Sequence, residues 1–287
     1  MNVSFTDNIT LTLLDAIKPA ILSARELKFA VAFMKYSGYV LIEQELKACL
    51  EKNARIEFLL GLDFQTTEPK VLKILNKLSL DNSQLKCYCF RDASFKDTSI
   101  YHPKLYLLNN EKEVVISLGS SNLTEGGLRD NIEANVVIKA DIKEEVVSDI
   151  YGIYNRFKFQ QYRFEPDTKY IDNYEEAYNR IRKRNIEALR EESTKKLLER
   201  LIDQEKDLPK PISIGPELFG WQKIVYEKLP LGKFRTRDIY RFEDEFRKYY
   251  PGNRNICAKI RQILQQLRDM GLIENPGRDS WVRHARR

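Results

Sequence analysis

Two periodicities of hydrophobic residues alternate along the first 160 residues. Apolar residues three or four positions apart lie on one face of a helix, and this spacing predicts helices over 9–22, 39–51 and 70–80. Short apolar runs predict strands over 27–34, 55–61, 85–90, 104–108, 113–118 and 132–140. Helices that alternate with strands, followed by clustered strands, predict an α/β domain with a mixed sheet flanked by helices.

The last quarter of the chain has a different pattern. Helical spacing predicts helices over 219–229, 237–250 and 255–270, and Gly271 ends the last of them. The short segments 272–274 and 281–283 flank the turn-rich 275–278, which predicts a β-hairpin. Three helices followed by a two-stranded wing predict a winged helix-turn-helix.

A charged segment joins these two parts. Its apolar residues fall at helical spacing over 171–181 and again over 197–202, and Pro209 and Pro211 end the helical pattern. We therefore predict an α/β domain over 1–160, a helical linker over 161–211 and a winged-helix domain over 212–287.

Composition excludes several classes of protein. Hydrophobic residues are 43% and charged residues 31% of the chain, which is ordinary for a protein that folds around a core. No apolar run approaches the roughly 18 residues of a membrane span, and no basic segment of a secretory signal precedes the first apolar run. Four cysteines and two histidines form neither a disulfide framework nor a zinc pattern. We expect a cytoplasmic protein that binds no membrane.

The positive charge lies in the last quarter. Residues 211–287 hold 16 Lys/Arg and 9 Asp/Glu, and the whole chain has a net charge of +6. A local basic field favours a polyanionic partner, although a solvated surface with chance asymmetry explains the charge alone equally well. The polar face of the last predicted helix can reach base edges and phosphates in a major groove. The candidate DNA-binding residues there are Arg254, Lys259, Arg261, Gln262, Gln265 and Gln266, and the predicted wing adds Arg278 and Arg283.

The candidate catalytic residues lie between 102 and 133. His102 and Lys104 are two positions apart in an extended segment, so their side chains share one face. Ser120 and Asn122 lie just past the end of the neighbouring strand predicted over 113–118, and Glu133 lies at the start of the one predicted over 132–140. An imidazole can attack phosphorus, while an ammonium and amide donors stabilise charge on the non-bridging oxygens. A carboxylate such as Glu133 can fix the imidazole tautomer by accepting from the other ring nitrogen.

His-x-Lys at 102–104, Gly-Ser-x-Asn at 119–122 and the downstream Glu133 together resemble the signature of the phospholipase D superfamily. The run from Gly119 to Leu128 is most similar to restriction endonucleases and related DNA nucleases of that superfamily. The resemblance covers about residues 20–160 and implies a phospholipase-D-like mixed sheet flanked by helices. It also implies a covalent phosphohistidine on His102, with no metal and no cofactor. The family's aspartate five residues after the lysine is Asn109 here.

One copy of the motif is present, so the resemblance also implies a homodimer that places two copies face to face. The C-terminal module over about 215–283 resembles the winged helix of methyladenine-dependent, Dam-replacing restriction enzymes. In that family an aromatic residue of the wing helps to sense the methyl group, and Trp281 is the candidate here. A wing residue packed on the core is an equally good interpretation of Trp281.

These observations predict a metal-independent, type II restriction-type endonuclease that acts on double-stranded DNA. The second hypothesis is a non-catalytic DNA-binding protein that uses the phospholipase-D-like domain as a dimerisation scaffold, and Asn109 is its best support. A lipid phosphodiesterase is a third hypothesis, disfavoured by the single motif copy and the DNA-binding module.

Overall fold

The structure is a computed structural model that describes residues 1–63, 66–91, 100–208 and 218–283. The chain divides into two compact units, Met1–Lys195 and Lys196–Arg287. Each unit is described by itself below.

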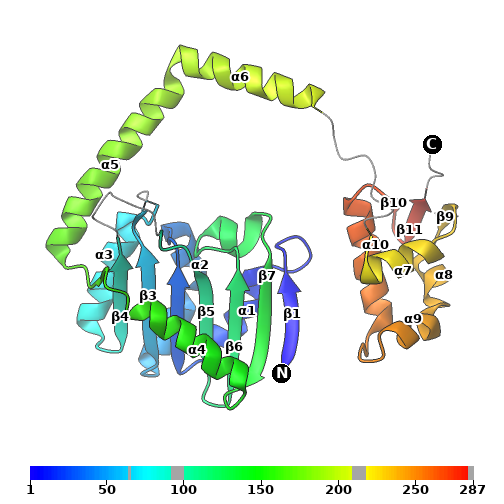
Figure 1. Cartoon of the computed structure of the whole chain (residues 1–287), viewed down its shortest axis with the longest axis horizontal. Helices are drawn as coiled ribbons and strands as arrows, with labels where there is room; N and C mark the ends of the chain where they lie inside the picture. The colour runs from blue at the N-terminus through cyan, green and yellow to red at the C-terminus, as the bar shows by residue number, and fades with distance from the viewer. Residues whose placement is uncertain (64–65, 92–99, 209–217, 284–287) are drawn as a thin grey trace. The chain divides into compact units, whose positions relative to one another are not determined.

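The first unit is built on an eight-stranded mixed sheet with the order β1-β7-β6-β5-β2-β3-β4-β8 (Figure 1). The strands are β1 (Asn2–Thr6), β2 (Glu26–Val31), β3 (Arg55–Gly61), β4 (Leu85–Phe90), β5 (Lys104–Asn109), β6 (Glu113–Gly119), β7 (Asn135–Asp141) and β8 (Arg163–Phe164). The central strands β2, β3 and β4 are parallel, and every other neighbouring pair is antiparallel.

One edge of this sheet collects the predicted catalytic segments. There β2, β3, β4 and β6 end, while β5 and β7 begin, because β5 and β7 run opposite to their neighbours. We call this the site edge; it is the upper edge of the sheet in Figure 1. The predicted strands match β2 to β7 to within a few residues at each end, since buried strands give continuous apolar runs.

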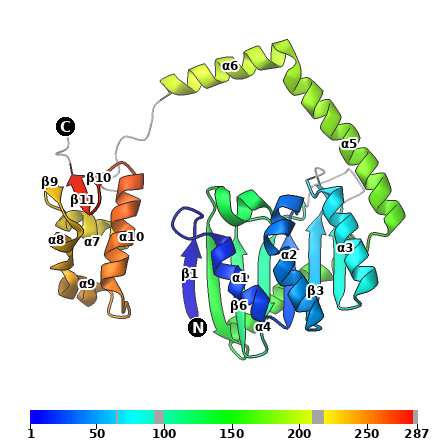
Figure 2. The same cartoon turned by 180° about the vertical axis from the view of Figure 1, so that it is seen from behind.

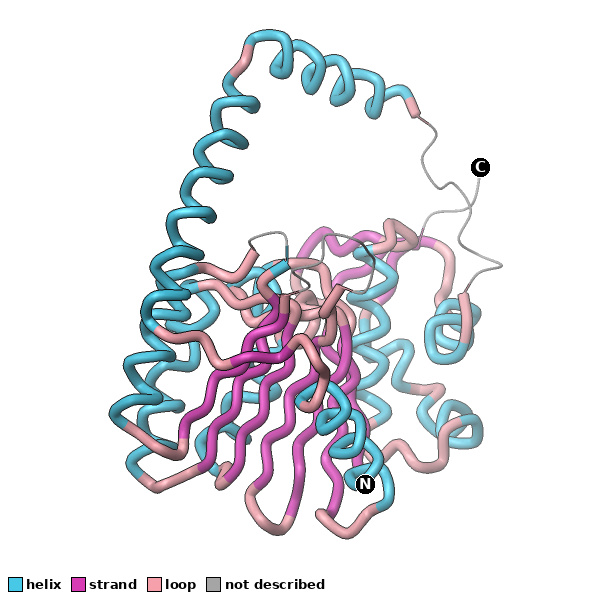
Figure 3. The backbone as a smooth tube through the Cα atoms, turned by 60° about the vertical axis from the view of Figure 1, so that its left-hand side comes forward, coloured by secondary structure: helices cyan, strands magenta, loops and turns pink. Residues whose placement is uncertain are grey.

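Helices cover both faces of the sheet. On one face lie α1 (Leu13–Ser23), α2 (Tyr36–Glu51), α3 (Pro69–Asp81) and the first turns of α5 (Thr168–Arg190). On the other face lies α4 (Glu145–Lys158), which packs through Val147 and Tyr154. Figure 1 shows α4 in front of the sheet, Figure 2 shows α1 and α3 from behind, and Figure 3 shows the strands between the two helical layers.

Helix α1 begins four residues later than predicted. The Asp7 carboxylate accepts hydrogen bonds from the backbone N–H groups of Ile9 and Thr10, at 2.9 and 2.7 Å, and this turn holds the chain out of the helix. Thr12 then caps the helix by accepting from the N–H of Asp15 at 3.0 Å. Pro19 lies inside α1.

The start of the predicted linker belongs to the first unit. Ile171 and Tyr174 of α5 are buried in the core beneath α1 to α3, and the Tyr174 hydroxyl donates to the carbonyl of Thr67 at 2.8 Å. Lys73 of α3 pairs with Glu175 at 2.7 Å. These contacts place the start of α5 in the first unit, which extends to Lys195. The domain bounds at residues 160 and 211 stay a prediction.

The second unit forms a winged helix-turn-helix around its own core. It contains most of α6 (Glu192–Asp207), then α7 (Gly220–Lys228), α8 (Thr236–Tyr240), α9 (Glu243–Tyr249) and α10 (Ile256–Asp269). A three-stranded sheet has the order β10-β11-β9, with β9 (Gly232–Phe234), β10 (Glu274–Gly277) and β11 (Ser280–Arg283). The apolar stripe of α10 is buried as predicted, through Ile260, Leu264 and Leu267 among others.

Two details of this unit differ from the sequence-based expectation. The helix predicted over 237–250 is two helices, α8 and α9, which separate at Arg241. The wing turn lies at Arg278–Asp279 rather than over 275–278, because Asp279 adopts a φ of 52° and closes the hairpin. Pro276 is tolerated inside β10 because that strand is at the edge of its sheet and pairs on one side alone.

No helix within the described ranges is both long and apolar enough to cross a bilayer.

Candidate active site

His102 and Lys104 meet at the site edge, where the chain enters β5. The Nζ atom of Lys104 lies 2.6 Å from Nδ1 and 3.1 Å from Nε2 of His102. It also donates to the His102 carbonyl oxygen at 3.0 Å. His102 is exposed whereas Lys104 is buried, so the ammonium lies beneath an imidazole that is open to solvent. The shared face predicted from the two-residue spacing brings the two groups into contact.

Ser120 and Glu133 form the second part of the site. The hydroxyl of Ser120, one residue past β6, donates to the Glu133 carboxylate and accepts from the N–H of Ala134 at 2.9 Å. Burial lowers the pKa of the Lys104 ammonium, and the Glu133 carboxylate lies close enough to oppose part of that change. The hydrogen bond predicted from His102 to Glu133 is replaced by the one from Ser120. Among the described residues, the ring nitrogens of His102 instead contact Lys104.

Asn122 connects the motif to the end of β2. Its side-chain oxygen accepts from the N–H of Phe33 at 3.2 Å, and Met34 forms a parallel bridge with Leu123. Because the oxygen is engaged, the two N–H groups of the amide are its donors toward a ligand. The half-buried Asn122 is thereby fixed beside the strand that pairs with β5.

A buried residue that the sequence interpretation missed holds this turn in place. The side chain of Asn135 accepts from the N–H of Ser121 at 3.2 Å and donates to Ser121 Oγ at 2.9 Å and Thr6 Oγ1 at 3.1 Å. A Cβ atom at Gly119 would lie 2.3 Å from the Ala134 carbonyl oxygen, so this position accepts glycine alone without rearrangement. In the sequence, a single asparagine at the start of an apolar strand was the signal that could have identified Asn135.

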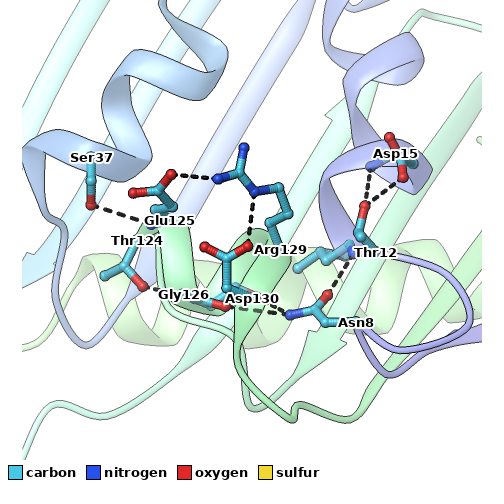
Figure 4. A network of polar contacts seen from close by, with 11 residues as sticks. Asn8, Thr12, Asp15, Ser37, Thr124, Glu125, Gly126, Arg129 and Asp130 are labelled. Carbon is cyan, nitrogen blue, oxygen red and sulfur yellow. Dashed lines mark hydrogen bonds and ion pairs between the residues drawn. The ribbon is translucent and has the colours of Figure 1, made fainter.

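A polar network fixes the segment between Asn122 and Glu133 against α1 and α2 (Figure 4). Asn8, at a φ of 58°, accepts from the N–H of Leu13 at 2.9 Å and donates to the carbonyl of Gly127 at 3.0 Å. Arg129 pairs with Glu125 and Asp130 on the same segment. These contacts set the positions of Asn122 and Glu133 from outside the motif.

The pKa values of the two cationic groups shift downward. Desolvation at the site edge, and then the adjacent Lys104 ammonium, lower the pKa of His102 below its usual value of 6.5. Burial lowers the pKa of Lys104, and the Glu133 carboxylate opposes that change. A lowered pKa keeps the imidazole of His102 neutral at neutral pH, which is the form that has a lone pair for nucleophilic attack.

The predicted DNA-binding residues of α10 lie at the surface, although several are engaged. Arg254, Arg261 and Gln265 are exposed, while Lys259 and Gln262 are half-buried. Arg261 donates to the Tyr240 hydroxyl at 2.7 Å, and Lys259 donates to Gln262 Oε1 at 2.9 Å. Gln266 accepts from Gln222 at 3.1 Å. Arg278 is exposed in the wing turn.

Two wing residues predicted to contact DNA, Trp281 and Arg283, point into the protein instead. Trp281 is 6% exposed, and its indole N–H donates to Thr236 Oγ1 at 2.9 Å. Arg283 donates to the carbonyls of Tyr226 and Leu229 and stacks on the Tyr226 ring. The third strand, β9, covers this side of the wing, so Trp281 is a core residue and not a surface residue for DNA. The second histidine, His284, lies outside the described residues.

Two families of known proteins match this chain, one within each of its two compact units. Residues 17–157 match the family described as cardiolipin synthase, PLD-like domain, and residues 222–282 match the family described as Dam-replacing HTH domain. The chain joins a PLD-like domain to a Dam-replacing HTH domain.

Solved structures resemble the PLD-like part. NucT from Helicobacter pylori is 16% identical with a TM-score of 0.43, and the alignment covers 54% of this chain and 94% of that one. Nuc from Salmonella typhimurium, a phospholipase D family member, is 16% identical with a TM-score of 0.42, over 57% of this chain and 99% of that one. Phosphatidylserine synthase from Haemophilus influenzae is 14% identical with a TM-score of 0.47, over 66% and 46% of the two chains.

Asn109 lies far from the site of the PLD-like domain. It ends β5 opposite Glu26, at the edge of the sheet away from His102. Its side-chain amide donates to the Tyr151 hydroxyl at 3.2 Å and accepts from the N–H of Glu111 at 2.7 Å. The asparagine therefore stabilises the turn after β5 and a contact with α4. It gives no support to the hypothesis of a non-catalytic scaffold.

Among the residues that the structure describes, no group of three or more His, Cys, Asp or Glu side chains is placed to hold a metal ion.

Proposed function

We propose that this chain is a metal-independent DNA endonuclease of the restriction type, which cuts double-stranded DNA through a covalent phosphohistidine. The observation that carries the proposal is the buried ammonium of Lys104 held against the exposed imidazole of His102. A Dam-replacing HTH domain in the same chain supports DNA as the substrate.

The reaction follows from the groups at the site edge. When a phosphodiester binds, the Lys104 ammonium moves from the ring nitrogen of His102 to a non-bridging oxygen, and this frees the imidazole lone pair. The imidazole nitrogen attacks phosphorus, and the bond to the leaving oxygen breaks. The Asn122 amide donates to the same non-bridging oxygens and stabilises their charge in the transition state. Water then attacks the phosphohistidine, releases the phosphate end and restores the imidazole.

The leaving oxygen needs a proton, which a second imidazole supplies and regains when water attacks. That ring becomes protonated once the bound phosphate anion offsets the charge of the lysine beside it. The chain holds two histidines, and His102 is the one within the PLD-like domain. We infer that a second copy of the chain provides the second His102, so that each site is built from two chains. Each chain then contributes His102, Lys104, Ser120, Asn122 and Glu133.

An exposed apolar row supports this assembly. Phe5, Val136 and Leu118 pair across β1, β7 and β6, so their side chains share one face of the sheet. Phe5 is 71% and Leu118 49% exposed, and Ser120 is two residues from Leu118. An apolar row beside a half-site suits a second copy of the same surface.

The winged-helix domain would deliver the duplex. Exposed Arg254, Gln265 and Arg278 combine a phosphate-binding charge with an amide able to read adenine in the major groove. Since Trp281 is buried, any discrimination of methylated adenine would come from the exposed residues of α10 and the wing turn.

The decisive experiment incubates supercoiled plasmid with the full chain in excess EDTA, with His102→Ala and His102→Gln as matched variants. We expect nicks and linear product from the wild type and none from either variant. Sequencing the fragment ends from methylated and unmethylated plasmid would give the site, the offset and the modification requirement together. Cleavage that needs magnesium, or that survives both substitutions, would overturn the proposal. Salt-sensitive DNA binding without nicks would favour the scaffold hypothesis instead.

A further inference from the structure

A cavity of about 360 Å³ opens beside His102 on the face of the sheet that α4 covers. It lies where β3 and β4 end, where the chain approaches β5, and where α4 ends. Since His102 and Pro103 form part of its wall, its contents would be adjacent to the reacting phosphorus.

The rings of four Phe and Tyr residues line part of the cavity wall. Tyr101 stacks on Phe90 with ring centres 4.2 Å apart and planes within 2° of parallel. Phe157 meets Tyr101 edge-on at 6.2 Å, and Tyr162 lines the cavity from the loop after α4. Tyr101 and Phe90 are fixed by this packing, whereas Tyr162 is 42% exposed and available to a ligand.

Three polar side chains also line the cavity, namely Asp63, Arg91 and Gln160. One oxygen of Asp63 accepts from the N–H of Tyr101 at 3.4 Å, which holds the carboxylate at the wall. A carboxylate accepts, a guanidinium donates and an amide does both, so together they match a flat ring with a polar edge. An acyl chain would fit poorly, because it would desolvate all three groups without replacing their hydrogen bonds.

We propose that this cavity binds an unstacked nucleobase of the nucleotide that adjoins the scissile phosphate. The inference rests on the proposed function, because it takes His102 as the nucleophile. A nucleobase has two apolar faces for Tyr162 and its neighbours and a polar edge for Asp63, Arg91 and Gln160. A volume of about 360 Å³ is at the small end of ligand cavities and suits a single ring system rather than a base pair.

The enzyme would therefore act on a nucleotide taken out of the helical stack. Flipping a base costs free energy, and the cost is lowest where the base is mismatched or already single-stranded. Phosphates beside such bases should be cut first. This selection at the catalytic domain would add to the site reading by the winged helix.

The test uses a single-stranded oligonucleotide whose main cleavage position in EDTA is mapped first. Two further strands then carry a tetrahydrofuran abasic residue in place of the nucleotide on either side of that position. Stacking on a protein aromatic ring changes affinity by about 5- to 150-fold per base. For one of the two strands we expect kcat/KM to fall by a factor within that range.

Tyr162→Ala should produce the same loss on the unmodified strand and almost no further loss on that abasic strand. Tyr162→Phe should keep the wild-type preference. Phe159→Ala is the matched control, because Phe159 is a 71% exposed aromatic residue of the same loop that does not line the cavity. It should behave as the wild type on all strands.

The outcomes separate this inference from the proposed function. If the wild type cuts all three strands equally, or if Tyr162→Ala slows the abasic and unmodified strands alike, the nucleobase site is wrong while the endonuclease stands. If none of the strands is cut in EDTA although supercoiled plasmid is, the nucleobase site is again wrong. If the plasmid is not cut either, or if His102→Gln still cuts it, the proposed function itself fails.

Discussion

The Nζ atom of Lys104, the first residue of β5, lies 2.6 Å from Nδ1 of His102, two positions before the strand. A cation this close disfavours protonation of the imidazole, which adds to the effect of desolvation. The buried lysine thus keeps its neighbour in the nucleophilic form, in addition to meeting the phosphate.

Replacing Lys104 by methionine should raise the pKa of His102 toward 6.5. The folded-state pKa is now lowered, so the neutral form of the wild-type ring persists to a more acidic pH than in a free histidine. Without the ammonium, protonation should begin at a higher pH. The Cε1–H resonance of His102 in a proton NMR titration measures this, and with two histidines in the chain His102→Gln assigns it. A pKa that is unchanged or lower in the methionine variant would contradict the electrostatic account.

Asn109→Asp should lower stability and leave cleavage intact. Asn109 donates to the Tyr151 hydroxyl, which itself donates to Glu26 at 2.7 Å. An aspartate could only accept there, so it would compete with Glu26 for the single proton of that hydroxyl. We expect the free energy of unfolding to fall by about 1–2 kcal/mol in urea titrations. The rate of plasmid nicking should change less than twofold. A large change in rate would mean that this position takes part in catalysis after all.

Charges in the apolar row should separate the two proposed copies. The double variant Phe5→Asp, Leu118→Glu is expected to sediment as a monomer and to lose nicking activity, because buried unpaired carboxylates at an interface cost several kcal/mol. Phe159→Asp is the matched control, since Phe159 has the same 71% exposure as Phe5 and lies at the C-terminal end of α4, outside the apolar row. It should leave the sedimentation coefficient unchanged. A monomeric double variant that still nicks DNA would rule out a site made of two chains.

Trp281→Phe should weaken the winged-helix fold without changing recognition of DNA. The change removes the indole hydrogen bond to Thr236 and leaves a small cavity, which together cost about 1–3 kcal/mol. The ratio of affinities for methylated and unmethylated duplexes should stay as in the wild type. Loss of methyl discrimination in Trp281→Phe would restore the role of Trp281 in sensing the methyl group.

Arg254→Ala, at an exposed position, should instead lower DNA affinity and the steepness of its salt dependence with no effect on stability.

The sequence predicted the part of the fold that carries the chemistry. Strands β2 to β6 are buried on both faces, so each appears as an apolar run whose ends are easy to place. Since His102, Ser120 and Glu133 follow or precede such runs, their gathering at one edge of a sheet could be anticipated. The distance of Asn109 from the site could also have been predicted from the sequence. A six-residue strand separates Lys104 from it by about 17 Å, which is too far for a shared site.

Other features had no comparable signal. The edge strand β1 has one neighbour and mostly exposed side chains, so its pattern resembles that of a loop. Burial of Trp281 depends on β9, a three-residue strand more than 40 positions earlier in the chain. The contacts of Asn135 and Asn8 depend on turns from distant segments, which local spacing does not encode.

Both tryptophans of this chain belong to the second unit, where Trp221 stacks on Tyr250 and Trp281 lies in the core. Indole emission excited at long wavelength therefore follows that unit alone, inside the intact protein. The winged-helix half carries its own built-in optical probe, and a titration with an unlabelled duplex can be followed without attaching a dye.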